Sequence, residues 1–401
     1  MQRQVFRPAP HIENVRYAIR NIAVEAARVE AEGKRVLYCN IGDPLRFDFA
    51  TPPHLVEAVE RAMRDGKNGY APSAGLLAAR TAVANDAVKR GMSQVTPGDV
   101  FITAGVSEAI DLVLTATLEP GDEVLLPCPG YPLYDAIAAR LHAKAVAYHP
   151  DEANGWQPDA RELESRITSK TRALVICNPN NPTGATYSSQ TLAALLDVAR
   201  RHQLLVLADE IYDRLLYGGT HVPMGTLAEG VALVMLNGLS KAYLCPGWRV
   251  GWLAFVNPNL TRDLARAVQR LADARLCGPA PVQHAVEPAL FGSQAHIAAA
   301  MAKLLPRRDL MVKRLNAIRG VSVVAPSGAF YAMPRLELPG LQSDEQFVLK
   351  LLREEQVLFV HGEGFGQKPG THHFRVVFLP PLEVLDEAFA RFERFVARWA
   401  P

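Results

Sequence analysis

The chain lacks any apolar run approaching the roughly 20 residues that a membrane helix requires. Its first residues, Met1 to Pro10, are polar and basic and do not form a signal peptide. It also lacks a one-sided charge, because 43 lysines and arginines oppose 41 acidic residues. That balance argues against nucleic acid or a strongly acidic partner. These absences predict a cytoplasmic protein that binds neither membrane nor nucleic acid.

Motifs for disulfides, metals and nucleotides are missing as well. None of the cysteines forms a Cys-x-x-Cys pair, and their odd number predicts reduced thiols, most simply small buried residues. The five are Cys39, Cys128, Cys177, Cys245 and Cys277. His372 and His373 have no histidine–carboxylate cluster at metal-ligand spacing, so no metal is predicted. Neither a Gly-x-Gly-x-x-Gly fingerprint nor a Walker loop occurs, and Gly362–Gly366 is expected to be a turn.

What the chain does contain is an alternation of short apolar runs with helix-length amphipathic segments. At 401 residues it is long enough for two domains. Expected strands are Val100–Ala104, Glu123–Pro127, Ala145–His149, Ala173–Cys177, Leu204–Ala208, Ala232–Leu236 and Val250–Val256. Helical patterns between them include Ser107–Leu118, Tyr131–Leu141 and Ser189–His202. Nearly continuous apolar strands alternating with helices predict an α/β architecture with a mostly parallel sheet between helices.

The two ends of the chain show a different pattern, which predicts a smaller α+β domain. Expected helices there are Ile12–Gly33, Gln294 to Arg319 past Pro306, Ser343–Glu355 and Leu382–Trp399. Expected strands are Val36–Ile41, Val321–Val324, Ala329–Met333, Val357–Val360 and Phe374–Phe378. We therefore expect a large cofactor-binding domain at residues 50–292 and a small domain formed by residues 1–49 and 293–401.

A lysine directly after an apolar strand is the first sign of chemistry. Ser240-Lys241 follows the run that ends at Leu236, so the ammonium is expected at the edge of the core. Desolvation there favours the neutral amine, which can form a Schiff base. Arg249, in Gly247-Trp-Arg249, adds a permanent positive charge nearby. A Schiff-base lysine beside an arginine suited to phosphate suggests pyridoxal phosphate. A lone Ser-Lys would be better explained as a surface lysine in a loop.

A phosphate site is suggested where Thr103-Ala-Gly-Val-Ser107 ends a strand and opens a helix. Free amides and the positive end of the dipole make a helix N-terminus suitable for an anion. Gly105 allows close approach of the backbone, and the Ser107 hydroxyl can donate, unless it only caps the helix. Ser240 and Arg249 would complete this phosphate cup, Arg249 with a bidentate grip.

Side chains after two further strands suit the cofactor's ring. Asp209 ends a buried strand, where a carboxylate points into the crevice that binds ligands in α/β proteins. Opposite a pyridine nitrogen it would hold the proton there, and Tyr212 could donate to the phenolic oxygen. Asn181, in Asn178-Pro-Asn-Asn-Pro-Thr-Gly184, presents a rigid amide to that oxygen and to a substrate carboxylate. The alternatives are a helix cap or a structural ion pair at Asp209 and a plain turn at Asn181.

Two more residues suit the ring and the substrate. Tyr131, at a strand-to-helix turn, could stack on the pyridine face or simply belong to the core. Arg375 alternates with Phe374 and Val376 along a strand, so it faces the other side. It could clamp an α-carboxylate bidentately, or it could be an exposed strand arginine.

In this ordered set the chain resembles fold-type I pyridoxal-phosphate aminotransferases of class I/II, from end to end. The matching pieces are Asn40–Pro44, Gly69-Tyr70, Asn178–Gly184, Asp209–Tyr212, Ser240-Lys241, Gly247–Arg249 and Phe374-Arg375. The resemblance implies the roles given above, together with Val106 at the phosphate and Gly42 in the substrate pocket. It implies that Tyr70 reaches the phosphate of a neighbouring subunit, and hence a homodimer with shared active sites that acts on amino acids and 2-oxo acids.

Within this family the chain is most similar to bacterial alanine (glutamate–pyruvate) aminotransferases. The similar pieces are Ile12–Val15, Asn237–Lys241, Arg275–Cys277, Gln283–Ala285 and His373–Arg375. Gly238 stands where many relatives have serine, which would remove one phosphate hydroxyl, but the alanine-using branch shares this glycine. Arg275 is a candidate second cation for a glutamate side chain.

Other activities stay open on the same scaffold. Aspartate, aromatic amino acids or methionine could be the amino donor. C–S bond cleavage by β-elimination and cyclopropane formation are different reactions of the same cofactor. A non-catalytic effector-sensing module is the remaining alternative, but the helix expected from Ile12 leaves no room for the DNA-binding segment it would need.

Overall fold

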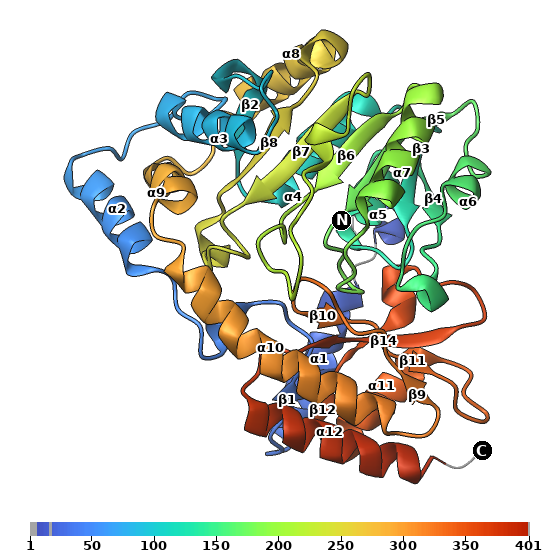
Figure 1. Ribbon diagram of the computed structural model, residues 1–401. Helices are drawn as coiled ribbons and strands as arrows, with labels where there is room; N and C mark the ends of the chain where they lie inside the picture. Colours follow the sequence, from blue (N-terminus) through green and yellow to red (C-terminus); the bar gives the residue numbers. More distant parts are fainter. Residues whose placement is uncertain (1–5, 16–17, 400–401) are drawn as a thin grey trace, which may run out of the picture.

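The computed structural model describes residues 6–15 and 18–399, and the fold and the site are those of this part of the chain. Figure 1 shows a large layered part that contains the long sheet and, below it, a smaller part made from both ends of the chain. The long helix α10 (Ala295–Asn316) connects them. Pro306 lies inside α10, as the sequence pattern predicted.

The central sheet has the strand order β2-β8-β7-β6-β5-β3-β4. Its strands are β2 (Val100–Thr103), β3 (Glu123–Pro127), β4 (Lys144–Tyr148), β5 (Thr171–Cys177), β6 (Leu205–Asp209), β7 (Leu233–Gly238) and β8 (Gly251–Phe255). Only β8 runs antiparallel to its neighbours. Almost every residue of these strands apart from those of β4 is buried, because both faces carry helices. The predicted mostly parallel sheet is therefore confirmed.

Helices cover each face of this sheet and form two apolar cores. One face carries α4 (Val106–Thr117), α5 (Leu133–Arg140) and α8 (Pro258–Arg275). The other face packs against α3 (Leu77–Lys89), α6 (Ala160–Glu164), α7 (Ser189–Arg201) and α9 (Val286–Phe291). Helix α2 (Pro53–Arg64) lies beside α9 at the edge of the molecule, as Figure 1 shows.

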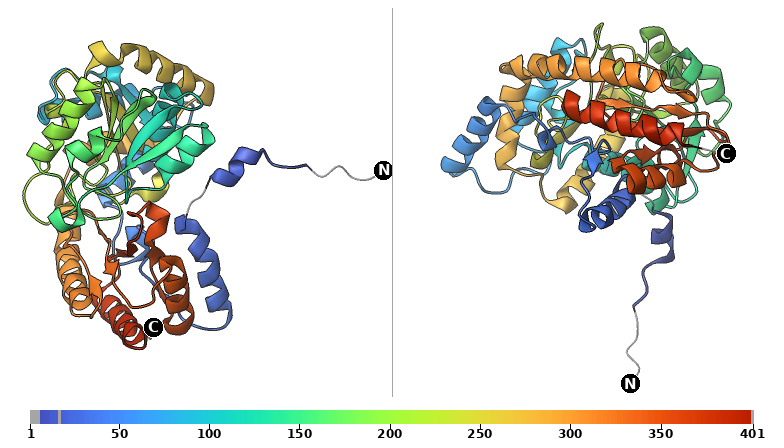
Figure 2. Two further views of the ribbon diagram at one scale, coloured as in Figure 1. Left: turned by 90° about the vertical axis from the view of Figure 1, so that its right-hand side faces the viewer. Right: turned by 90° about the horizontal axis from the view of Figure 1, so that it is seen from below.

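The smaller part pairs one end of the chain with the other. Strand β1 (Leu37–Tyr38) runs parallel to β12 (Val357–Leu358). A separate antiparallel sheet contains β10 (Tyr331–Ala332), β14 (His372–Val377), β11 (Arg335–Leu336) and β9 (Val321–Ser322), with β13 (Val360–His361) also on β14. Helices α1 (Ala18–Ala31), α11 (Asp344–Glu355), α12 (Leu382–Ala397) and α10 surround these strands, as Figure 2 shows from two further sides. This arrangement supports the division into residues 50–292 and residues 1–49 with 293–401, which we propose as the two domains.

Short 3-10 helices occupy many of the connections. They are Pro10–Asn14, Pro44–Arg46, Pro97–Asp99, Glu152–Asn154, Met224–Thr226, Pro246–Trp248, Pro281–Ala285 and Gly362–Phe365. The last one replaces the turn expected at Gly362–Gly366. No helix among residues 6–15 and 18–399 is long and apolar enough to cross a membrane.

The single helix expected over Ile12–Gly33 is wrong. A 3-10 turn ends at Asn14, and Val15 is extended, with φ −80° and ψ 97°. Helix α1 is described from Ala18 onward, and Arg16 and Tyr17 lie outside the described residues. The apolar periodicity continues across this break, so the sequence pattern could not show it. The short strand β11 was missed because two residues carry no detectable periodicity.

Candidate active site

A cavity of about 300 Å³ lies at the carboxyl ends of the central parallel strands, against the smaller part. The predicted site residues line it, apart from Tyr70 and the candidate cation Arg275. They are Gly42, Val106, Ser107, Tyr131, Asn181, Asp209, Tyr212, Ser240, Lys241, Arg249 and Arg375. Larger cavities, of about 790, 700, 570 and 490 Å³, contain neither Lys241 nor Asp209. The smaller cavity is therefore the one that carries the predicted chemistry.

Lys241 enters this cavity from the turn that follows β7. Its Nζ donates a hydrogen bond to the carbonyl oxygen of Gly42, at 2.9 Å. The same nitrogen lies 5.7 Å from the centre of the Phe330 ring. An amine held by one weakly binding carbonyl beside an apolar ring can exchange that contact for a covalent partner.

Asp209, at the end of β6, is buried beneath the same cavity. Burial raises the pKa of its carboxyl group to about 6, although Tyr134 and the Ile211 amide oppose this shift by donating hydrogen bonds. The Tyr134 hydroxyl donates to Asp209 Oδ2 at 2.9 Å from helix α5. Tyr134 was not predicted from the sequence, where its only signal is its spacing of three residues from Tyr131 along the helical pattern.

Tyr134→Phe is expected to lower kcat/KM about 10-fold or more, because a hydrogen bond to a charged group is lost. The lost donor stabilised the carboxylate, so the pKa of Asp209 rises further and the acid limb of the kcat/KM profile moves to higher pH. Tyr148→Phe is the matched control, since the Tyr148 hydroxyl is equally buried but donates to the Val175 carbonyl oxygen at 2.8 Å. An acid limb that stays in place in Tyr134→Phe would contradict this role.

Arg375 on β14 reaches the cavity from the smaller part. Its side chain is only 2% exposed, so the alternative of an exposed strand arginine is wrong. It donates to Asn181 Oδ1 at 3.1 Å and to the Asn40 carbonyl oxygen at 2.6 Å. The rings of Tyr331 and Phe365 lie 4.8 and 4.7 Å from its guanidinium carbon. These contacts hold the guanidinium in one orientation, as a carboxylate clamp requires.

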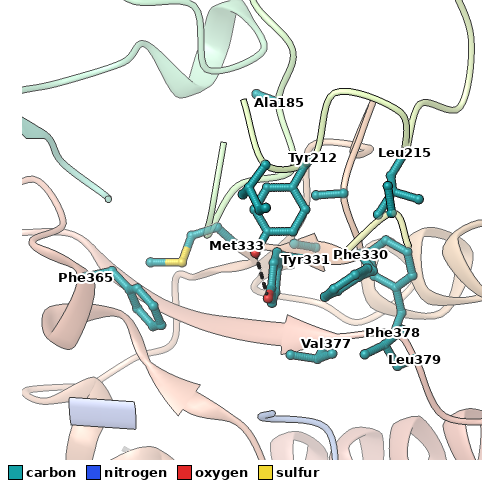
Figure 3. Packing of buried hydrophobic residues seen from close by; sticks show 14 of the residues in the cluster. Ala185, Tyr212, Leu215, Phe330, Tyr331, Met333, Phe365, Val377, Phe378 and Leu379 are labelled. Atoms are coloured by element: carbon teal, nitrogen blue, oxygen red, sulfur yellow. Dashed lines mark hydrogen bonds between the residues drawn. The ribbon is translucent and has the colours of Figure 1, made fainter. Parts of the chain in front are cut away.

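Tyr212 and Tyr331 both line the cavity, and Figure 3 shows their hydroxyl groups next to each other. The Tyr212 hydroxyl donates to that of Tyr331 at 3.0 Å, and burial raises the pKa of Tyr212 well above its usual value. Tyr331 also explains why position 42 is glycine, because a Cβ there would lie 2.0 Å from the Tyr331 hydroxyl oxygen. Tyr331 was not predicted as a site residue, because it lies in an expected strand of ordinary apolar character.

The phosphate end of the cavity is formed where α4 begins. Gly105 precedes the helix with φ +78°, and a Cβ there would lie 2.1 Å from Arg249 Nη2. Arg249 donates to the carbonyl oxygens of Ala104 and Pro246, both at 3.1 Å. Its positive charge thus lies at the positive end of a helix dipole, an arrangement that becomes favourable when an anion binds between them. This donor set, with Ser107 and Ser240 nearby, fits a phosphate group.

A steric restriction, which the sequence could not reveal, explains why position 238 is glycine. It is paired with Gly251 across β7 and β8. A Cβ at position 238 would lie 2.7 Å from the Val250 carbonyl oxygen and 2.8 Å from the Gly251 Cα. A side chain therefore has no room here, so the glycine is a packing requirement of this chain as well as a missing hydroxyl.

Gly238→Ala is expected to lower the free energy of unfolding by about 1–3 kcal/mol, the usual cost of overpacking. Thermal unfolding of the purified variant measures this cost. Gly218→Ala is the control, because a Cβ at Gly218 would meet no atom within 4 Å. Equal melting temperatures for the two variants would show that the backbone around Gly238 yields without cost.

Two candidate residues lie outside the cavity, and one further group of side chains there has the spacing of metal ligands. Arg275 does not line the cavity, and its Nε lies 3.2 Å from Glu108 Oε1. Tyr70 is 83% exposed and does not reach the cavity of its own chain. Asp344, His361 and Glu363 have ligand atoms within 4.8 Å of one another, but Asp344 Oδ2 already accepts hydrogen bonds from Gln367 and two backbone amides.

Comparison with known proteins identifies the family. Residues 35–392 match the family described as aminotransferase class I and II. The chain belongs to this family. It is 42% identical to the alanine aminotransferase of Mycobacterium tuberculosis, over 99% of this chain and 94% of that protein. It is 39% identical to the glutamate-pyruvate aminotransferase AlaA of Escherichia coli, over 96% of both chains.

Solved structures of aminotransferases share the whole fold. The alanine aminotransferase from Pyrococcus furiosus superposes with a TM-score of 0.95 and 42% identity, covering 98% of this chain and all of that one. The aspartate aminotransferase from Thermus thermophilus has a TM-score of 0.89 and 30% identity, over 98% of this chain and all of that chain. The predicted fold-type I aminotransferase architecture is confirmed, and membership of the family implies a pyridoxal-phosphate-dependent aminotransferase that acts on amino acids and 2-oxo acids.

Proposed function

We propose that this aminotransferase exchanges an amino group between alanine and 2-oxoglutarate, and in reverse between glutamate and pyruvate. The observation that carries this choice is the likeness, over nearly the whole chain, to relatives named alanine and glutamate-pyruvate aminotransferases. Small substrates also suit a cavity of about 300 Å³ in which Tyr331 lies against Gly42.

The residues around the cavity fit pyridoxal phosphate. When bound, this cofactor supplies an aldehyde that condenses with amines and a ring that draws electrons from the substrate's Cα. Lys241 Nζ would hold it covalently. Val106, Ser107, Ser240 and Arg249 would bind the phosphate. Asp209 would keep a proton on the ring nitrogen, Tyr212 and Asn181 would donate to the phenolic oxygen, and Tyr131 would stack on the ring.

The substrate would be oriented by the other side of the cavity. Arg375 binds its α-carboxylate through the guanidinium fork, with Asn181 beside it and the backbone of Gly42 below. With its Nζ free, Lys241 would take the proton from the substrate's Cα as a general base. Arg375 fixes which bond at Cα faces Lys241, so binding and proton transfer depend on one geometry.

A panel of donors and acceptors tests the substrates. Alanine with 2-oxoglutarate and glutamate with pyruvate should give the highest kcat/KM among alanine, glutamate, aspartate, tyrosine and methionine. Product analysis distinguishes transamination from C–S cleavage, which would release a thiol. Preference for another donor by more than tenfold would overturn the alanine assignment, and release of thiol as the main product would overturn transamination.

We further propose a homodimer in which Tyr70 completes the phosphate site of the neighbouring subunit. The exposure of Tyr70 supports this, together with exposed apolar side chains close to it in the sequence. Met63 on α2 is 47% exposed and Leu77 on α3 is 61% exposed. A cytoplasmic location is proposed as well, because all five cysteines are free, and cell fractionation tests it.

Mixing two inactive variants tests the shared site. Tyr70→Ala and Lys241→Ala homodimers are each expected to have low activity. In a hybrid dimer one site has Lys241 from the first subunit and Tyr70 from the second, so activity returns to about a quarter of wild type at equal mixing. Activity that does not rise after subunit exchange, in a sample shown by mass spectrometry to contain hybrids, would contradict the shared site.

A further inference from the structure

Beneath the proposed cofactor site lies a buried group of charges that the proposed chemistry does not use. Arg90, at the C-terminal end of α3, has a side chain only 17% exposed. Its guanidinium lies 2.9 Å from Asp213, 3.4 Å from Glu210 and 3.6 Å from Asp86. Burial opposes its charge, but Asp213 and Glu210 outweigh this and raise the pKa of Arg90.

Glu210 and Asp213 belong to the segment that carries two site residues. Asp209 and Tyr212 line the cavity, whereas Glu210 and Asp213, within the same five residues, are buried beside Arg90. Asp86 is shared with a second arginine, since Arg214 Nη2 lies 3.0 Å from its Oδ1. Arg90 therefore contacts the buried side of the turn that carries Asp209 and Tyr212.

The same group of charges also contacts the segments that carry Lys241 and Asn181. The Asn237 amide donates to Asp213 Oδ2 and to the Glu210 carbonyl oxygen, both at 3.0 Å, four residues before Lys241. His221 lies 3.3 Å from Arg90 Nη2 through Nδ1 and 3.2 Å from the Asn178 carbonyl oxygen through Nε2. Arg90 can donate to Nδ1 while the Nε2 hydrogen is donated to Asn178, so this tautomer satisfies both contacts.

We propose that Arg90 is a positioning residue whose guanidinium, through Glu210, Asp213 and His221, fixes the three segments that bear Asn181, Asp209 and Lys241. This inference rests on the proposed function of the cavity. Removing one partner of a buried ion pair leaves the others as uncompensated charges. Glu210 and Asp213 would then repel each other within the turn, and the three segments would lose their common anchor.

The test measures pyridoxal-phosphate affinity by fluorescence titration of Arg90→Gln, Arg90→Lys and the double variant Arg90→Gln/Asp213→Asn. Arg90→Gln should raise the Kd by roughly 10- to 100-fold, the loss of charge-assisted hydrogen bonds. The absorbance midpoint of the loaded protein should move to higher pH, because excess negative charge favours the protonated form of the Lys241–cofactor link. Arg90→Lys should give an intermediate Kd, and the double variant should recover part of the loss.

Arg80→Gln is the matched control, because Arg80 lies on the same helix but donates to the carbonyl oxygens of Gly75 and Pro97. It should lower the melting temperature without moving the Kd or the midpoint. Wild-type Kd and midpoint in folded Arg90→Gln would overturn the proposal. If Arg90→Gln does not fold, a wild-type Kd in Arg90→Lys overturns it and a raised Kd supports it. Wild-type protein that binds no cofactor would instead overturn the proposed function.

Discussion

Lys241→Ala is expected to lose transamination almost completely, with kcat reduced by at least about 10⁴-fold. The variant loses both the amine that would hold the cofactor and the base that would take the α-proton. In the structure the Lys241 ammonium contacts the Gly42 carbonyl oxygen, so its removal leaves the surrounding fold with one hydrogen bond fewer. Measurement of the alanine half-reaction in single turnover gives the size of the effect.

A chemical label tests the same residue independently of turnover. Borohydride reduction of the loaded wild-type protein should add the cofactor's mass to the peptide containing Lys241, and to no peptide of Lys241→Ala. Lys144→Ala is the control, since that lysine is largely exposed and pairs with Glu123 at 3.2 Å. Labelling of another lysine in the wild-type protein, or a kcat within tenfold of wild type in Lys241→Ala, would disprove the assignment.

The central sheet could be predicted because its strands are simple sequence patterns. Strands buried on both faces are continuous apolar runs, and β3 has the predicted bounds, Glu123–Pro127. The smaller part was harder, because strands such as β11 span two residues and gain their order from pairing with β9 and β14. The break after Val15 was invisible for a related reason, since apolar spacing on its two sides is in phase.

The site residues also fall into a group that the sequence predicted and a group that it did not. Side chains such as Asp209 and Lys241 directly follow strands, and the carboxyl ends of parallel strands converge, so the sequence could bring them together. Contacts made from other elements could not be found this way. Tyr134 reaches Asp209 from 75 residues away, and Tyr331 reaches Tyr212 from 119 residues away. The contacts of Arg90 could not be predicted either, because the sequence of a helix end does not indicate which buried carboxylates its arginine will meet.

Arg375→Lys is expected to lower kcat/KM for alanine about 10²- to 10³-fold, although the positive charge is kept. Lysine cannot form the fork that binds both carboxylate oxygens, and it cannot keep the contacts to Asn181 and Asn40 at the same time. The loss should depend on the substrate's carboxylate. Rates for ethylamine, which is alanine without that group, should therefore stay within about threefold of wild type.

The ratio of kcat/KM for alanine to that for ethylamine isolates the carboxylate contact from any general damage to the fold. Arg335→Lys is the matched control, since Arg335 lies on the neighbouring strand β11 and pairs with Glu152 and Glu337 at 3.2 and 2.9 Å. Its ratio should match wild type. If Arg375→Lys slows alanine and ethylamine equally, the arginine supports the fold without binding substrate, and the carboxylate must be held elsewhere.

A selective loss for alanine means that this buried fork gives the enzyme its requirement for an α-carboxylate. The choice among amino acids then falls to the side-chain end of the cavity, where Tyr331 lies against Gly42.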